Sequence, residues 1–173
     1  RQIYAYLKNY FDKKNSVKNR NYKALVTAGP TREYLDPVRY ISNESSGKQG
    51  CEIAIALDRL GVKTTLITGP TNFVLPKSIR VKKIISADEM LDNVKKTLPV
   101  DLAVCAAAVS DLKPKDKSRT KIKKNDLNFK SINFIKNSDI LEYLSKNNKH
   151  RPRLVAGFSA ETENLIENSI KKL

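Results

Sequence analysis

The sequence feature that most constrains the fold is the stretch of residues 25–50. It opens with a short apolar run, breaks at Gly29 into a long polar loop, and ends at Gly47 and Gly50, where a helical pattern of apolar residues begins. A strand, a polar loop with glycine and a helix start receive phosphate groups in α/β folds, because backbone N–H groups and the helix dipole face the anion there. We interpret the stretch as an anion-binding loop. The alternative is a plain connecting loop whose serines cap the helix.

The rest of the chain alternates predicted strands and helices. Short apolar or β-branched runs predict further strands at residues 62–68, 79–85, 102–108 and 154–159. Helical spacing of apolar residues predicts helices at residues 47–60, 86–98, 138–144 and 162–173. This alternation predicts an α/β fold, a Rossmann-like, doubly wound, mostly parallel sheet that binds ligands at the carboxyl ends of its strands.

A basic segment, residues 113–124, comes after the fourth or fifth strand of this sheet. Its cationic residues are Lys113, Lys115, Lys117, Arg119, Lys121, Lys123 and Lys124. Turn residues at 125–126, between residues 121–124 and the run 127–132, predict a hairpin that projects from the sheet as a flexible basic loop.

The net charge of +15 over 173 residues favours anionic partners such as nucleotides, phosphorylated metabolites, nucleic acid or acidic lipid. The alternative is a lysine-rich surface that only keeps the protein soluble.

Cys51 and Cys105 lack zinc-site spacing, and we interpret them as small buried thiols in a reducing compartment. The alternative for Cys51, which lies beside a helix start, is a lowered pKa. The chain has no apolar stretch of membrane-spanning length and no signal-peptide pattern, so we predict a cytoplasmic protein.

Two common phosphate-binding motifs are excluded. Residues 46–48 resemble the end of a P-loop, but Ser42 stands where the first glycine belongs and Gln49 replaces the magnesium-binding Ser or Thr. The first loop has one glycine followed by a proline, which is not the dinucleotide fingerprint. Neither a Walker-type ATPase nor a standard NAD oxidoreductase is therefore supported.

Two single residues, Asp111 and His150, have side chains that carry chemistry in other proteins. Asp111 directly follows a buried strand on the predicted ligand rim, where carboxylates bind ribose or a metal, and a turn-forming aspartate is the alternative. His150 has no Ser or Cys neighbour that would complete a triad, so we interpret it as a surface residue.

Several motifs occur together and in order. They are residues 27–31 (TAGPT), 36–43 (DPVRYISN), 45–48 (SSGK), 107–109 (AAV) with Asp111, 121–124 (KIKK), 157–158 (GF) and 160–162 (AET). On these motifs the chain resembles, over roughly residues 22–172, phosphopantothenoylcysteine synthetase, the phosphopantothenate–cysteine ligase of coenzyme A biosynthesis. In most bacteria that enzyme is the C-terminal half of a bifunctional protein whose N-terminal half is an FMN-dependent decarboxylase.

The resemblance implies a two-step ligation. CTP activates the carboxylate of 4′-phosphopantothenate as an acyl-cytidylate with release of pyrophosphate, and the amine of cysteine then displaces CMP. Mg²⁺ accompanies the CTP, while FMN belongs only to the decarboxylase half. The implied partners are these substrates, a second copy of the chain in a homodimer, and a phosphopantothenoylcysteine decarboxylase domain or chain. A membrane and nucleic acid are not among them.

The resemblance also implies site residues. Asn43 matches the asparagine that holds the acyl-cytidylate, and Lys121 matches the catalytic lysine of a flexible loop near the phosphates. Arg39 is added as a phosphate contact, and Lys48 is interpreted only as a helix-start charge. The nucleotide site is implied at Gly29, Ser45, Ser46, Ala106, Ala107, Ala108, Asp111, Lys121, Ser138, Asp139, Ile140, Leu141, Phe158 and Lys172. No metal ligand is assigned.

The chain departs from the family pattern at two places. Ser138 stands where the family usually has proline, and the chain ends at Leu173, where the family continues. We expect residues 1–21 to be an N-terminal helix and linker, the tail of a preceding decarboxylase-like domain. Residues 22–173 are then a nucleotide-binding ligase domain that is incomplete at its C-terminus.

The alternative function is a non-catalytic nucleotide- or nucleic-acid-binding module, which the lack of interleaved aromatic and basic residues disfavours.

Overall fold

The structure, a computed structural model, describes residues 22–123, 132–146 and 149–160, together with Ala5, Glu163, Asn164, Glu167 and Ile170. Most of the predicted N-terminal helix and linker lies outside the described residues. So do the turn of the predicted hairpin at residues 125–126 and most of the predicted helix at residues 162–173, including Lys172. Every other predicted site residue is described.

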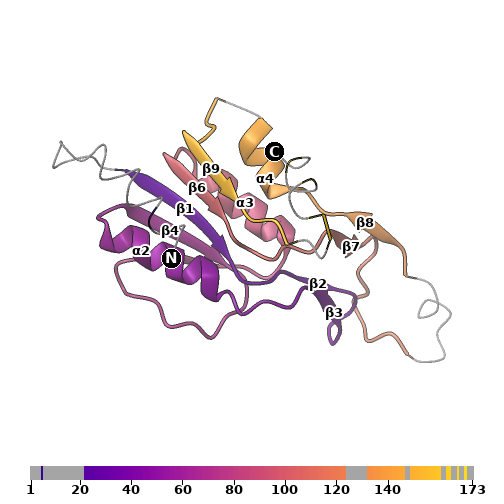
Figure 1. Cartoon of the computed structure of the whole chain (residues 1–173). Helices are drawn as coiled ribbons and strands as arrows, with labels where there is room; N and C mark the ends of the chain where they lie inside the picture. Colours follow the sequence, from indigo (N-terminus) through magenta and orange to yellow (C-terminus); the bar gives the residue numbers. More distant parts are fainter. Residues whose placement is uncertain are drawn as a thin grey trace.

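A five-stranded parallel sheet forms the centre of the fold (Figure 1). Its strands are β1 (Lys23–Ala28), β4 (Lys63–Thr68), β5 (Arg80–Lys83), β6 (Leu102–Cys105) and β9 (Leu154–Gly157). Their spatial order is β5-β4-β1-β6-β9, so the chain winds outward from β1 first in one direction and then in the other. This confirms the predicted doubly wound fold and puts the reversal of strand order beside β1, where such folds bind ligands.

Helices cover both faces of the sheet, because strand residues that point in opposite directions are both apolar. Leu25 and Val26, consecutive in β1, are both fully buried. Val26 packs with Leu57 of α2 (Lys48–Arg59) on one face. Leu25 packs with Met90 of α3 (Ala87–Thr97) on the other face, which α4 (Ile140–Lys146) also covers. None of the described helices is long and apolar enough to cross a membrane.

Side chains cap α3 and α4, which begin close to the predicted helix starts at residues 86 and 138. Ser86 Oγ accepts a hydrogen bond from Glu89 N at 3.2 Å at the start of α3, and Asp139 Oδ1 accepts one from Glu142 N at 2.9 Å at the start of α4. At the start of α2, Ser46 Oγ accepts a hydrogen bond from Lys48 N at 3.3 Å. The N-cap residue of α2 is Gly47, whose φ of 73° lies in the left-handed region. A glycine at this position is thus required by the backbone rather than by packing alone.

Two short antiparallel ribbons project from the carboxyl end of the sheet (Figure 1). The first pairs β2 (Arg32–Tyr34) with β3 (Tyr40–Ser42), where we predicted only a polar loop. The second pairs β7 (Leu112–Pro114) with β8 (Phe134–Lys136). It confirms a projecting hairpin around the basic segment, but its strands lie outside the predicted ones. The first ribbon is anchored on α3, because buried Glu33 accepts a hydrogen bond from Ala87 N at 2.9 Å.

Candidate functional site

The turns that follow β1 and β6 meet at the carboxyl end of the sheet. Ala108 N donates to Gly29 O at 2.9 Å, and Thr31 N donates back to Ala108 O at 3.3 Å. These bonds form one isolated parallel bridge, Pro30 with Ala108, beyond the β1–β6 ladder that ends at Cys105, so β6 is shorter than the predicted strand. The predicted nucleotide-site residues that they bring together are Gly29, Ala106, Ala107 and Ala108.

The turn after β4 is pressed against the turn after β1. Gly69 N donates to Ala28 O at 3.0 Å. A Cβ atom at Gly69 would lie 1.7 Å from the carbonyl oxygen of Pro30, which leaves no room for any side chain. The similar Gly-Pro-Thr endings of the two strands therefore form one packed corner of the site.

Asn43 follows the end of β3 and is bonded to the same edge of the sheet. Its Nδ2 donates to Val109 O at 3.0 Å. Its neighbour Ser42 donates through Oγ to Thr31 O at 2.7 Å. The Ser42 bond closes the base of the first ribbon, and the Asn43 bond joins it to Val109, which directly follows the alanine segment at residues 106–108.

A polar network that sequence analysis missed joins Asp111 to the start of α4. Ser110 N donates to the Oγ1 of the fully buried Thr31 at 3.0 Å. Asn137 donates through Nδ2 to Ser110 O and through its backbone N to Asp111 O, both at 2.8 Å. The predicted residues 138–141 directly follow Asn137, so these bonds bring them to Asp111. Sequence spacing gives no signal for this network, because its partners lie far apart in the chain.

The end of β9 completes this side of the rim. Phe158, a predicted site residue, directly follows the strand and is 39% exposed. A Cβ atom at Gly157 would lie 2.6 Å from Leu141 Cδ2, so the end of the strand is in close contact with α4. The predicted residues Leu141 and Phe158 therefore come from neighbouring elements.

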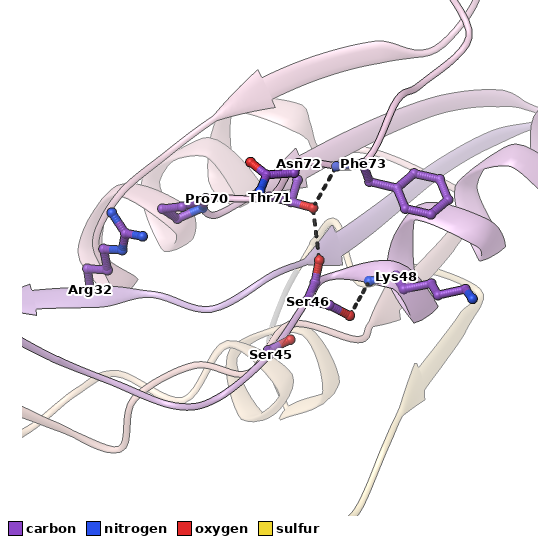
Figure 2. A pocket seen from close by; sticks show the side chains of 8 residues that line it. All are labelled: Arg32, Ser45, Ser46, Lys48, Pro70, Thr71, Asn72 and Phe73. Carbon is purple, nitrogen blue, oxygen red and sulfur yellow. Dashed lines mark hydrogen bonds between the residues drawn. The ribbon is translucent and has the colours of Figure 1, made fainter.

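A cavity of about 430 Å³ opens beside the start of α2 (Figure 2). Its walls are Arg32, Ser45, Ser46, Lys48, Pro70, Thr71, Asn72 and Phe73. Figure 2 shows Arg32 on one side, the two serines on another and the 70–73 loop along a third, while the Lys48 side chain extends away from Arg32. Thr71 Oγ1 donates to Ser46 O at 2.9 Å and closes that loop onto the helix start. Ser45 Oγ accepts from Gly47 N at 3.2 Å and Ser46 Oγ accepts from Lys48 N at 3.3 Å, so the serines bond the N–H groups at the helix start. The cavity is suited to an anion because its walls carry two cationic side chains and two hydroxyl groups.

The structure adds two cations to the predicted anion-binding loop. Arg32 was not predicted as a site residue, and Lys48 was interpreted only as a helix-start charge. Both line the cavity with Ser45 and Ser46. Arg32 was not predicted as a site residue because the strand that carries it, β2, was not predicted.

Arg39 is bonded within the protein and reaches the basic segment. Its Nη2 and Nε donate to Asp36 Oδ2 at 2.6 and 3.0 Å, and Nη2 also donates to Ile122 O at 2.5 Å. Burial by itself raises the pKa of the fully buried Asp36, but hydrogen bonds from Val38 N and from Arg39 hold that pKa well below its ordinary value. Lys121 is exposed and directly precedes Ile122. Arg39 thus bonds the carbonyl group of the residue that follows Lys121.

Both cysteine thiols are held neutral. Burial, with a smaller contribution from Glu52, raises the pKa of Cys51. Burial, with a smaller contribution from Asp139, raises the pKa of Cys105 to about 12. The alternative of a lowered pKa at Cys51 is wrong, because this thiol lies in the core between α2 and the sheet. Among the described residues, no group of three or more His, Cys, Asp or Glu side chains is arranged to hold a metal ion.

Comparison with known proteins gives a family match over most of the chain. The family described as the DNA/pantothenate metabolism flavoprotein C-terminal domain matches residues 19–173. The coenzyme A biosynthesis bifunctional protein CoaBC of Borreliella burgdorferi is 40% identical over 99% of the chain and 44% of its own length. The protein of the same name from Haemophilus influenzae is 40% identical over 99% of the chain and 42% of its own length. The chain thus spans less than half of these curated relatives.

Solved structures share the fold. The crystal structure of the C-terminal domain of a coenzyme A biosynthesis bifunctional protein CoaBC has 37% sequence identity and a TM-score of 0.76, covering 89% of this chain and 72% of that one. A variant of Cab2 in complex with phosphopantothenate-cysteine has 17% identity and a TM-score of 0.69, covering 99% of this chain and 75% of that one. At that identity the second likeness concerns the fold alone.

Proposed function

Because the chain belongs to the family of DNA/pantothenate metabolism flavoprotein C-terminal domains, we propose that it catalyses the ligase step of coenzyme A biosynthesis. In this reaction the carboxylate of 4′-phosphopantothenate is joined to the amine of cysteine, giving phosphopantothenoylcysteine. The ligase domain is assigned to residues 22–173, and residues 1–21 to the tail of a preceding domain.

The observation that carries the proposal is the bond between Asn43 and Val109. It brings the family motifs at residues 36–43 and 107–111, which are far apart in the chain, to one edge of the sheet beside β1. An amide group has two N–H donors and one acceptor oxygen, so the bond to Val109 orients Asn43 and leaves it capacity to hold a ligand. The small side chains of Ala106, Ala107 and Ala108 leave room for a nucleoside on the same edge.

The first step activates a poor acyl donor. A carboxylate oxygen of phosphopantothenate attacks the α-phosphorus of CTP, the bond from that phosphorus to the bridging oxygen breaks, and pyrophosphate leaves. Negative charge accumulates on the phosphates, so fixed cations and N–H groups lower the barrier. We assign this role to Lys121 and to the cavity walls Arg32, Ser45, Ser46 and Lys48.

The second step forms the amide bond. The amine nitrogen of cysteine attacks the acyl carbon, the bond from that carbon to the phosphate oxygen breaks, CMP leaves, and the nitrogen loses a proton. We assign Asn43 to holding the acyl-cytidylate during this step. Asp111 and residues 138–141, which the Asn137 network brings together, are assigned to the nucleotide, with Phe158 beside them.

Arg39 stays a predicted phosphate contact, and its guanidinium also has the internal partners Asp36 and Ile122. Lys172, which lies outside the described residues, stays a predicted nucleotide contact.

Mg²⁺ fits this site as a companion of the nucleotide. The described residues offer no cluster of three carboxylate, histidine or cysteine ligands, which suits an ion held mainly by substrate phosphates and water. Asp111, exposed at the rim, is the carboxylate placed to share such an ion. When bound, the ion would neutralise charge on the triphosphate.

Two protein partners belong to the proposal. A second copy of the chain is proposed to pack on the projecting ribbons, whose apolar residues Tyr40, Leu112, Phe134 and Ile135 are each more than 40% exposed. Exposed apolar side chains gathered on such ribbons favour association with a partner surface. The decarboxylase half, with its FMN, is proposed as the other partner, since the chain matches less than half of its bifunctional relatives.

The test is pyrophosphate release from CTP in the presence of phosphopantothenate and cysteine. We expect turnover by the parent protein, and losses of about 10²- to 10³-fold in kcat for Asn43→Asp and Lys121→Gln, as for removal of a group that stabilises transition-state charge. Turnover that neither change affects would refute the assigned roles. Absence of turnover, combined with RNA binding that weakens steeply with salt, would favour the nucleic-acid-binding alternative.

A further inference from the structure

Asp36 accepts more hydrogen bonds than its own turn requires. Its side chain is completely buried, and its Oδ1 accepts from Val38 N and Arg39 N, both at 2.8 Å. Those two bonds are the local turn that an aspartate before a proline commonly makes. Its Oδ2 accepts from the Arg39 guanidinium and from Ile122 N, the latter at 3.2 Å. The second oxygen, Oδ2, thus bonds to Ile122, which lies 86 residues further along the chain.

The Asp36–Arg39 pair holds both sides of the backbone at one residue. Ile122 N donates to Asp36, and Ile122 O accepts from Arg39 Nη2. The N–H of Ile122 belongs to the planar peptide unit that includes Cα of Lys121. Fixing that unit therefore fixes the backbone from which the Lys121 side chain extends.

A second contact fixes the same segment a few residues earlier. Ser118 N donates to Leu35 O at 2.9 Å, next to Asp36 in the sequence. Ser118 Oγ in turn donates to Thr120 O at 2.6 Å, which closes a local turn. Residues 118–122 are therefore tied at both ends to residues 35–39, with Lys121 between the two attachments.

We propose that Asp36 is a positioning residue for the proposed ligase reaction: its buried carboxylate, together with Arg39, holds the Ile122 backbone so that Lys121 is presented to the phosphates. This inference rests on the proposed function, because it takes Lys121 as the residue that acts. Asp36 itself is buried beneath the segment and acts only through its neighbours.

The substitution Asp36→Asn separates the local turn from the long-range contact. The amide oxygen of asparagine can still accept from Val38 N and Arg39 N. Its NH₂ group would then face Arg39 and Ile122 N, so that donors oppose donors. Asp88→Asn is the matched control, because Asp88 also pairs with a lysine of the basic segment, Lys113 at 2.5 Å, but does not bond to residues 118–122.

The first measurement does not depend on ligase activity. Trypsin cleaves after lysine, and we expect cleavage after Lys121 and Lys123 to become about tenfold faster or more in Asp36→Asn, in proportion to the population of the opened segment. Mass spectrometry of the fragments identifies the bonds cut. Cleavage of these bonds at the rate of the parent protein and of Asp88→Asn would overturn the proposal. Arg39→Lys, which keeps the cation but not the fork that reaches Ile122 O, should show an intermediate rate.

The second measurement asks whether Asp36 acts through Lys121. We expect Asp36→Asn to lower kcat by about 10- to 100-fold, as misplacement of a reacting group does. In a Lys121→Gln background, the same change should lower kcat no further. Equal losses in both backgrounds would show a general structural effect and refute the positioning role. If Lys121→Gln alone leaves kcat unchanged, the proposed role of Lys121 fails, while the proteolysis result still decides whether Asp36 holds the segment.

Discussion

The substitution Gly50→Ala tests how closely α2 approaches the central strand. Gly50 is buried in the first turn of the helix, where alanine is favoured over glycine by about 1 kcal/mol. A Cβ atom there would lie 2.5 Å from Ala28 Cβ, 2.8 Å from Thr27 O and 3.0 Å from Ala28 Cα. Two of these three atoms belong to the strand backbone, so relief requires that the whole helix shift. We place the cost of overpacking near the top of its usual range, about 3 kcal/mol.

The net expectation for Gly50→Ala is destabilisation by about 2 kcal/mol, the overpacking cost less the gain in helix propensity. For a chain of this size, that lowers Tm by about 4–8 °C. Urea unfolding followed by circular dichroism measures the free energy. Gln49→Ala is the control, because Gln49 is exposed in the same helical turn and should change stability by less than about 0.5 kcal/mol. A Gly50→Ala protein more stable than its parent would refute the reasoning, since the helix would then have room to move.

Three further predictions concern the core, the thiols and the buried carboxylate. Leu144→Ala should lower the free energy of unfolding, measured in urea, by about 2–5 kcal/mol, because Leu144 is fully buried between α4 and the sheet. A decrease of less than about 1 kcal/mol would contradict that packing. Cys51 and Cys105 should resist Ellman's reagent at pH 8 until guanidinium unfolds the protein, since burial raises both pKa values; rapid reaction of the folded protein would contradict this. The pKa of Asp36 is lower in the folded protein than its ordinary value of 3.8, so its contribution to stability is complete above that value and is lost as pH falls toward the folded pKa. The difference in unfolding free energy between the parent protein and Asp36→Asn should therefore be constant above about pH 5 and become smaller below about pH 4. A difference that becomes larger as the pH falls would contradict this prediction.

The central sheet and its helices could be predicted from sequence because each has a periodic signal. The apolar runs that became β1, β4 and β6 are buried on both faces, and the caps Ser86 and Asp139 mark real helix starts. The periodic apolar residues are the ones that pack in the core, so the pattern in the sequence reports the buried faces directly. The family motifs added the candidate site residues, and hydrogen bonds bring Asn43 and the segment at residues 106–111 to one edge of the sheet.

The ribbons could not be predicted in the same way. Each strand of the ribbons has only three residues, and β8 is exposed along its whole length, so no core-facing alternation appears in the sequence. The cavity wall at Arg32 was missed for this reason. The partners of Asn137 and Asp36 were missed for another reason, because their bonds join segments that only the topology brings together.

The packed corner between Pro30 and Gly69 limits how the chain can vary in length. The two turns share one space, since the carbonyl of Pro30 occupies the position that a side chain at residue 69 would take. An inserted residue in either turn would displace the other turn and, through it, the bond from Ala108 to Gly29. Insertions and deletions in these two turns should therefore not be tolerated. A library of single-residue insertions scanned along the chain would show the corner as a sharp minimum in tolerance.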